Sequence, residues 1–184
     1  MADVAVVIGH HPDAKGASLE LGGHEISEYD FWKPWGHELA ASLHQQGLHA
    51  VTVERPHEEP DQALAERVNA TEAAAAIELH FNAAEPGADG TEMLHWPSSS
   101  RGSTLAARLQ HETVKALKTR DRGIQARDDL AFLKLTEMPA VICEPAFGSD
   151  EGDAWRLLTR QVRLMEAYRT ALTSFCLDKT GVGA

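Results

Sequence analysis

Short apolar runs alternate with longer segments in which apolar residues recur at helical spacing, and this alternation most constrains the fold. Residues 4–8 are apolar throughout and end at Gly9, which is typical of a strand buried on both faces. Further strands are predicted over residues 48–53, 77–81, 91–96 and 140–144. This order predicts a single layered α/β domain with a mostly parallel, twisted sheet flanked by helices.

Helical spacing predicts four helices between and after these strands. The first should end near Gly47, and Pro34 should kink it or lie in its first turn. Its apolar face is formed by Trp32, Trp35, Leu39 and Leu43. Asp61 is suited to cap the second helix, which is expected to include the alanines at 73–76, and Ser103 is suited to cap the third.

The last predicted helix ends near Phe175 and completes the domain. Its apolar face is expected to hold Leu158, Val162, Met165 and Leu172. The domain is therefore expected to span residues 1–178, with residues 179–184 as a frayed tail.

Composition excludes several classes of function. The formal net charge is -11 over 184 residues, with no concentrated run of basic residues, so nucleic acid is not an expected partner. No segment approaches the roughly 18 consecutive apolar residues of a membrane helix, so stable membrane insertion is not expected. The first residues lack the pattern of a secretion signal, which predicts a protein that is cytoplasmic as synthesised.

Three side chains suited to metal binding or proton transfer stand where predicted strands end. His10 follows the first strand, His80 lies near the end of the third, and Glu144 ends the last. In open α/β sheets, ligands bind outside the carboxyl ends of the strands. Two histidines and a carboxylate can hold a catalytic zinc ion with one position left open, although the long, irregular spacing does not by itself identify the ligands.

Six segments, in order over about four-fifths of the chain, carry a resemblance to a known family. They are residues 9–17, Glu28, and residues 78–84, 90–92, 122–124 and 139–147. Together they resemble the zinc-dependent N-acetylmuramoyl-L-alanine amidases of the amidase-3 family, which includes phage endolysins and bacterial cell-wall amidases. The Glu-Leu-His-Phe-Asn segment is more similar to the phage members.

The resemblance implies a reaction and a set of site residues. It implies that His10, Glu28 and His80 hold Zn2+ and that Glu144 is the general base. The expected substrate is peptidoglycan, cut between N-acetylmuramic acid and L-alanine by a bacteriolytic endolysin that reaches the cell wall after its release. His95, Asn82 and Arg122 are expected to line a substrate groove.

Four alternatives stay open at the level of sequence. Glu25 lies close enough to Glu28 to be the ligand in its place. The chain could be a zinc hydrolase that acts on another amide, or a non-catalytic peptidoglycan-binding or regulatory protein of the same fold. A cysteine hydrolase built on Cys143 is disfavoured, because Cys143 and Glu144 are neighbours on a strand and should face opposite sides.

Overall fold

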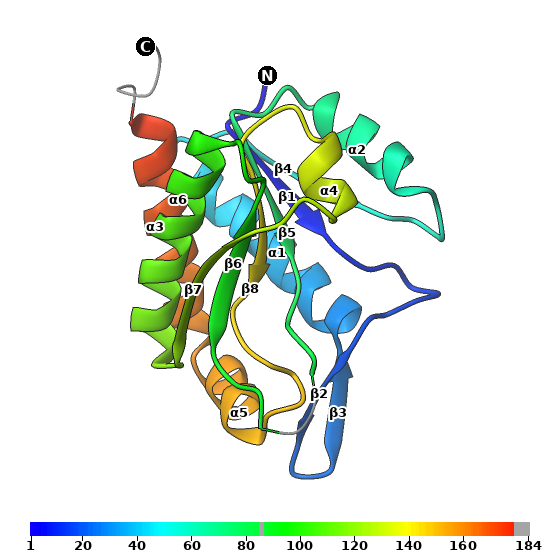
Figure 1. Cartoon of the computed structure of the whole chain (residues 1–184), viewed down its shortest axis with the longest axis vertical. Helices are drawn as coiled ribbons and strands as arrows, with labels where there is room; N and C mark the ends of the chain where they lie inside the picture. The colour runs from blue at the N-terminus through cyan, green and yellow to red at the C-terminus, as the bar shows by residue number, and fades with distance from the viewer. Residues whose placement is uncertain (85–86, 179–184) are drawn as a thin grey trace.

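A six-stranded sheet forms the centre of the protein in the computed structural model, which describes residues 1–84 and 87–178 (Figure 1). Its strand order is β4 (Ala50–Glu54), β1 (Val4–Ile8), β5 (Ala75–Leu79), β8 (Ala140–Glu144), β6 (Thr91–His95) and β7 (Asp121–Ala126). The first four strands are parallel. Strand β6 pairs antiparallel with β8 and parallel with β7, so the last two strands run the opposite way.

Helices cover both faces of this sheet (Figure 1). One face packs against α1 (Glu28–His44), α3 (Ser100–Leu117) and α6 (Gln161–Leu177), and the other against α2 (Asp61–Asn69) and α4 (Ala131–Leu135). A further helix, α5 (Glu151–Thr159), lies near the end of the sheet and packs against β2 (Ser18–Leu21). The predicted layered α/β domain with a mostly parallel sheet is confirmed.

Strand β1 shows why its sequence reads as an unbroken apolar run. All five of its residues are buried, because β4 and β5 lie on either side and helices cover both faces. Val4, Val6 and Ile8 join the core under α1, whereas Ala5 and Val7 join the core under α2 and α4. The same alternation directs neighbouring residues of β5 and β8 to opposite faces.

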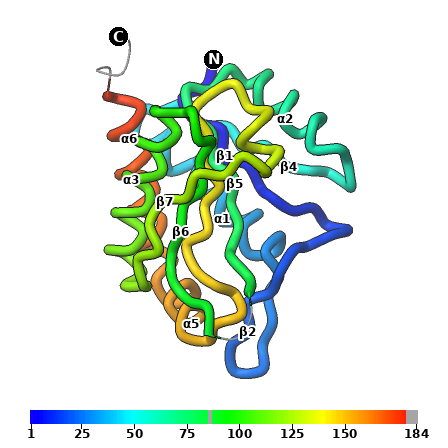
Figure 2. The backbone as a smooth tube through the Cα atoms, viewed as in Figure 1, coloured from blue at the N-terminus to red at the C-terminus, as the bar shows by residue number. Residues whose placement is uncertain are grey.

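A hairpin that was not predicted connects β1 to α1. Strands β2 and β3 (His24–Ser27) pair antiparallel through a turn at Gly22 and Gly23, both with positive φ. The hairpin lies at the end of the molecule opposite the N-terminus (Figure 2). Each of its strands has only four residues, which is too short for an alternation such as Ser18-Leu19-Glu20-Leu21 to stand out as a strand.

The start of α1 decides between the two positions expected for Pro34. Ser27 caps the helix by accepting a hydrogen bond from the Asp30 amide at 3.2 Å, so Glu28 is the first helical residue. Pro34 therefore lies inside the helix, beyond its first turn. Glu28 is thus held at the N-terminus of the helix.

Four helix boundaries differ from the prediction. The N-cap of α2 is Pro60, so Asp61 is the first helical residue and not the cap. Helix α2 ends at Asn69, and Ala75 and Ala76 belong to β5, where their small side chains are buried between neighbouring strands. The cap of α3 is Ser99, not Ser103, because the Ser99 hydroxyl accepts from the Gly102 amide at 3.0 Å. The chain breaks at Arg160 into α5 and α6, which leaves Val162 75% exposed and outside the apolar face.

Across residues 1–84 and 87–178, none of the helices combines the length and hydropathy needed to cross a bilayer. The frayed tail expected at residues 179–184 lies outside the described residues.

Candidate active site

The residues suited to chemistry meet at the carboxyl ends of three adjacent strands. His10 lies two residues beyond β1, His80 directly follows β5, and Glu144 is the last residue of β8. Because β1, β5 and β8 are parallel neighbours, their carboxyl ends lie side by side at one edge of the sheet. Glu28 reaches the same place from the first turn of α1.

Glu28 stands between the two histidines. Its Oε2 is 3.0 Å from Nε2 of His10, and its Oε1 is 3.2 Å from Nδ1 of His80. One ligand atom from each of the three residues can be chosen so that all lie within 4.8 Å of one another. Two imidazoles and one carboxylate at this separation suit a zinc ion with a fourth, open coordination position.

Backbone amides fix the orientation of the Glu28 carboxylate. Its Oε2 accepts from the Ala17 amide at 2.7 Å, and its Oε1 accepts from the Phe81 amide at 2.9 Å. The residue is only 4% exposed. The rival, Glu25, is exposed on β3 and bonded to the Ser18 hydroxyl, so the structure places Glu28 beside the histidines and leaves Glu25 outside the group.

The electrostatics of this group favour charged side chains when metal is absent. Burial opposes ionisation of Glu28, but hydrogen bonds from His10 and His80 outweigh it and lower the pKa of Glu28 to about 2. Burial likewise opposes protonation of His80, yet Glu28 and Glu78 raise the pKa of His80 to about 10. Oε2 of the buried Glu78 lies 3.5 Å from Nε2 of His80, whereas Glu28 lies near Nδ1, the other nitrogen of the ring.

Two glycines leave room for the ligands. A Cβ at Gly9 would lie 2.1 Å from Nε2 of His80, and a Cβ at Gly16 would lie 2.3 Å from Oε2 of Glu28. Gly16 also has a φ of +78°, which residues with a side chain rarely adopt. Larger residues at either position would displace a proposed ligand.

Replacing Gly9 with alanine should therefore weaken zinc binding by at least about tenfold, the scale of loss when the support of a metal ligand is removed. The added methyl group would occupy the space of the His80 imidazole. Zinc affinity can be measured by competition with a chromogenic chelator. Gly152→Ala is the matched control, because Gly152 is exposed on α5 and a Cβ there meets only side-chain atoms of Arg156 and Asp150, the nearest at 3.0 Å. Equal zinc affinity in Gly9→Ala and the control would contradict the proposed ligand geometry.

Glu144 lies beside His10 and His80 in one cavity. This cavity has a volume of about 370 Å³, and its lining also includes Arg55 and Phe132. The pKa of Glu144 is raised to about 7, and burial is the main cause. The negative charges of Glu92 and Glu28 add to this rise, whereas the charge of His80 opposes it. A carboxyl group with such a pKa can accept and return a proton near neutrality.

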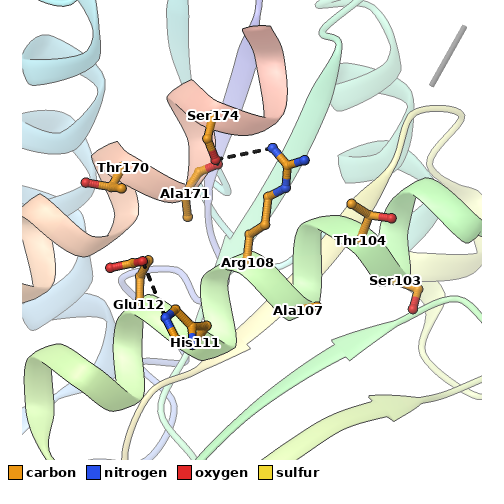
Figure 3. A pocket seen from close by; sticks show the side chains of 9 residues that line it. All are labelled: Ser103, Thr104, Ala107, Arg108, His111, Glu112, Thr170, Ala171 and Ser174. Atoms are coloured by element: carbon orange, nitrogen blue, oxygen red, sulfur yellow. Dashed lines mark hydrogen bonds and ion pairs between the residues drawn. The ribbon is translucent and has the colours of Figure 1, made fainter. Parts of the chain in front are cut away.

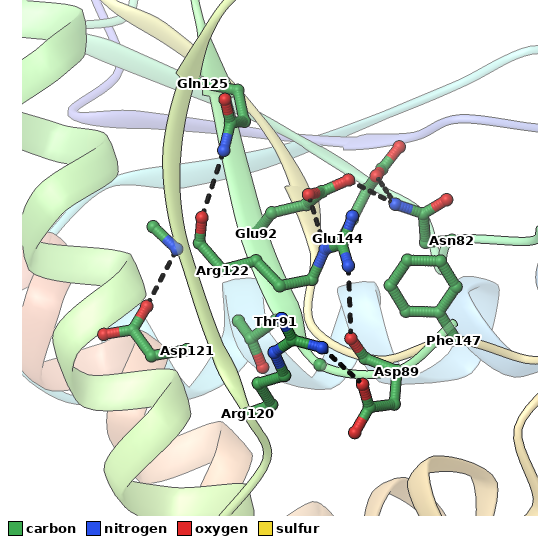
Figure 4. Close-up of polar contacts among 12 residues, drawn as sticks. Asn82, Asp89, Thr91, Glu92, Arg120, Asp121, Arg122, Gln125, Glu144 and Phe147 are labelled. Carbon is green, nitrogen blue, oxygen red and sulfur yellow. Dashed lines mark hydrogen bonds and ion pairs between the residues drawn. The ribbon is translucent and has the colours of Figure 1, made fainter. Parts of the chain in front are cut away.

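The structure places the three expected groove residues differently. Asn82 contacts Glu144 directly, and Arg122 is paired with Glu92, so both belong to a polar network beside the cavity (Figure 4). His95 lies apart from this network. Strand β6 runs antiparallel to β8, so His95 pairs with Val141, which lies near the amino end of β8, whereas Glu144 is at the carboxyl end. The carboxyl end of β6 therefore points away from the site, a reversal that the sequence did not indicate.

Glu78 and Glu92 are two residues of the site that were not predicted. Both are charged residues inside strands and are largely buried, with Glu78 against His80 and Glu92 against Asn82 and Arg122. A charged residue within an otherwise apolar run was the available signal, because such a side chain is rarely buried without a partner.

Cys143 lies on the other face of the sheet, as its position next to Glu144 predicted. It is fully buried in the core formed with α1, α3 and α6. Burial raises the pKa of its thiol to about 12, so the thiolate needed by a cysteine hydrolase is disfavoured.

A second cavity, of about 480 Å³, lies between α3 and α6 (Figure 3). Its lining includes Arg108, which donates to the Ser174 hydroxyl at 3.3 Å, and His111, which lies 3.8 Å from Glu112. Within the described part of the chain, the only group of three side chains placed to hold a metal is His10, Glu28 and His80. Among the described residues, the larger cavity therefore holds no group of three side chains placed to bind a metal.

Comparison with known proteins identifies the family of the chain. A sequence model of a family, described as N-acetylmuramoyl-L-alanine amidase, matches residues 4–174. The chain is 28% identical over 160 residues to the uncharacterized protein YqiI of Bacillus subtilis, which covers 84% of this chain and 74% of that protein. It is also 29% identical over 89 residues to an uncharacterized cell wall amidase of Bacillus anthracis. This match covers 44% of this chain and 17% of the Bacillus anthracis protein.

Solved structures share the fold. An N-acetylmuramoyl-L-alanine amidase from Clostridium difficile 630 superposes with a TM-score of 0.82 at 24% identity, over 96% of this chain and 97% of the other. The catalytic domain of the CD27L endolysin, described as targeting Clostridia Difficile, has a TM-score of 0.77 at 20% identity, over 97% and 98% of the two chains.

Proposed function

Because the chain belongs to the amidase-3 family of N-acetylmuramoyl-L-alanine amidases, we propose that it is a zinc-dependent enzyme that cuts peptidoglycan between N-acetylmuramic acid and L-alanine. The observation that carries this proposal is the meeting of His10, Glu28 and His80 with Glu144 at one edge of the sheet. The three ligand side chains fit zinc by their chemistry, and Gly9 and Gly16 leave them the space they need.

Zinc bound by these residues would supply Lewis acidity, which polarises the scissile carbonyl and makes a neighbouring water more acidic. Glu144 accepts the proton of the water that attacks the lactyl carbonyl. It then returns this proton to the nitrogen of L-alanine as the amide bond breaks, because an amine leaves poorly without protonation. The pKa of about 7 suits both transfers near neutral pH.

His80 is oriented from two sides. Glu28 lies near Nδ1 and Glu78 near Nε2, so the Glu78 carboxylate can accept the proton on Nε2 and keep Nδ1 free to bind metal. The amides of Ala17 and Phe81 hold Glu28 in turn. The chain therefore fixes the direction of two ligands before metal binds.

The decisive test of this function is a product analysis. Purified peptidoglycan is incubated with the zinc-loaded protein, with and without a chelator, and the products are identified by mass spectrometry. Released peptides with a free N-terminal L-alanine, formed only without chelator, are the expected result. Cut glycan strands, cleaved stem peptides or undiminished activity in chelator would overturn the proposal.

We also propose that the enzyme acts as a phage or prophage endolysin. The Glu-Leu-His-Phe-Asn segment at residues 78–82, with its likeness to phage members of the family, supports this role. Expression inside a bacterium whose cytoplasmic membrane is permeabilised should cause lysis, and a Glu144→Gln variant should cause none. Unaffected turbidity with active enzyme and a permeabilised membrane would refute the lytic role while leaving the amidase activity intact.

A further inference from the structure

A single amide group bridges two carboxylates beside the proposed metal site (Figure 4). Nδ2 of Asn82 donates to Oε2 of Glu144 and to Oε1 of Glu92, at 2.5 Å in both cases. An amide nitrogen carries two hydrogens, so it can satisfy both acceptors at once. The two glutamates are also directly paired across the antiparallel strands β6 and β8.

Glu92 is held from its other oxygen by Arg122. Nε of Arg122 donates to Oε2 of Glu92 at 2.8 Å, and the guanidinium lies 4.9 Å from the centre of the Phe147 ring. This ring is buried, so the arginine has a fixed surface on which to stack. Both oxygens of Glu92 are thus engaged, one by Asn82 and one by Arg122.

The backbone around this network is itself anchored. The Thr91 hydroxyl donates to the Pro145 carbonyl at 2.6 Å, which ties the start of β6 to the residue after Glu144. The buried Asp153 accepts from the amides of Gly90 and Phe147, at 2.7 and 3.2 Å. The relative positions of Glu92 and Glu144 are therefore set by strand pairing and by buried hydrogen bonds.

We propose that Glu92, held by Arg122, is a positioning residue for the hydrolysis: it orients the Asn82 amide toward Oε2 of Glu144 and leaves Oε1 to exchange the proton. This inference rests on the proposed amidase function and assigns Glu92 and Arg122 a role outside the metal ligands and the general base. It also explains why Asn82 and Arg122 stand beside the cavity and are absent from its lining.

The charges around Glu144 give the network a second effect. Glu92 and Glu28 raise the pKa of Glu144, after burial, whereas His80 lowers it. Arg127, just beyond β7, interacts electrostatically with both Glu144 and Glu92, and Arg122 neutralises Glu92 directly. Removing the negative charge of Glu92 should lower the pKa of Glu144, and removing the positive charge of Arg122 should raise it.

The test compares zinc-loaded Glu92→Gln and Arg122→Ala with wild type on a soluble muramoyl-peptide fragment. We expect Glu92→Gln to lower kcat by about ten- to hundredfold with KM little changed, the range seen when partners of a catalytic ligand are lost. The acidic limb of the pH profile should move to lower pH in Glu92→Gln and to higher pH in Arg122→Ala. A general loss of structure would not produce shifts of opposite sign.

The controls separate positioning from folding and from the proposed function. Glu54→Gln is matched to Glu92→Gln, because Glu54 is also a strand glutamate paired with a cation, Lys33. Glu54 belongs to β4, the edge strand on the side of the sheet opposite to β6 and β7. This variant should keep wild-type kcat and pH profile. Arg122→Lys retains the positive charge and should recover most of the activity lost in Arg122→Ala, which tests the pair even where Glu92→Gln fails to fold.

An active wild-type enzyme combined with unchanged kcat and pH profile in Glu92→Gln would overturn the positioning role alone. Shifts of the same sign in Glu92→Gln and Arg122→Ala would also overturn it. An inactive wild-type protein that retains zinc would instead overturn the proposed function.

Discussion

Replacing Glu144 with glutamine should abolish peptidoglycan hydrolysis while zinc stays bound. Glutamine has nearly the same shape and can still accept a hydrogen bond from Asn82, but it cannot take a proton from water near neutral pH. Loss of a general base lowers the rate by about 10² to 10⁴, and here the same group must also protonate the leaving nitrogen. Hydrolysis is measured as released N-terminal L-alanine, and zinc by atomic absorption on the same preparation.

Two results would count against this role for Glu144. Near-normal hydrolysis by Glu144→Gln would mean that another group transfers the proton. Loss of zinc along with activity would mean that Glu144 supports the metal rather than the reaction. Glu137→Gln, at an exposed glutamate before β8, is a suitable control and should behave as wild type.

Replacing His80 with alanine should remove both zinc and activity. His80 supplies one of three proposed ligand atoms, and its loss leaves the buried Glu28 with a single imidazole partner. We expect zinc stoichiometry to fall from about one to near zero after dialysis, since catalytic zinc sites depend on three protein ligands. His111→Ala is the control, because His111 is exposed on α3, far in the fold from the strand ends.

Zinc affinity of the wild-type protein should also rise with pH across neutrality. His80, with a pKa raised to about 10 in the metal-free protein, is protonated at neutral pH and must lose this proton to bind metal. Each unit of pH below this value should then weaken zinc binding by about tenfold if one proton is released. Calorimetry in buffers with different ionisation enthalpies measures the released proton directly, and zinc binding without proton release would contradict the assignment of His80 as ligand.

The sequence predicted the parts of the fold that depend on burial. The apolar run of β1 and the run that ends at Glu144 were recognisable because strands covered on both faces have no polar alternation. His10, His80 and Glu144 could be placed at one edge of the sheet for the same reason. The β2–β3 hairpin was not predicted because its strands have only four residues each, and the edge strand β7 was not predicted because its sequence is mostly polar.

The polar network escaped sequence analysis for a different reason. Its geometry depends on the direction of β6, and nothing in residues 91–96 distinguishes a parallel from an antiparallel strand. A parallel β6 would bring His95 to the site, as expected from the sequence, and carry Glu92 away. The observed pairing reverses both placements, because Glu92 pairs with Glu144 and His95 with Val141.

The reversed direction of β6 has a consequence for the thermodynamics of turnover. A residue on a paired strand has already lost its backbone freedom on folding, whereas a residue on a loop would lose it when substrate binds. Glu92 enters the site from such a strand, so little ordering is left for the catalytic step. The conformational entropy of the Glu92 backbone is thus lost once, when the protein folds, and not again each time a substrate binds.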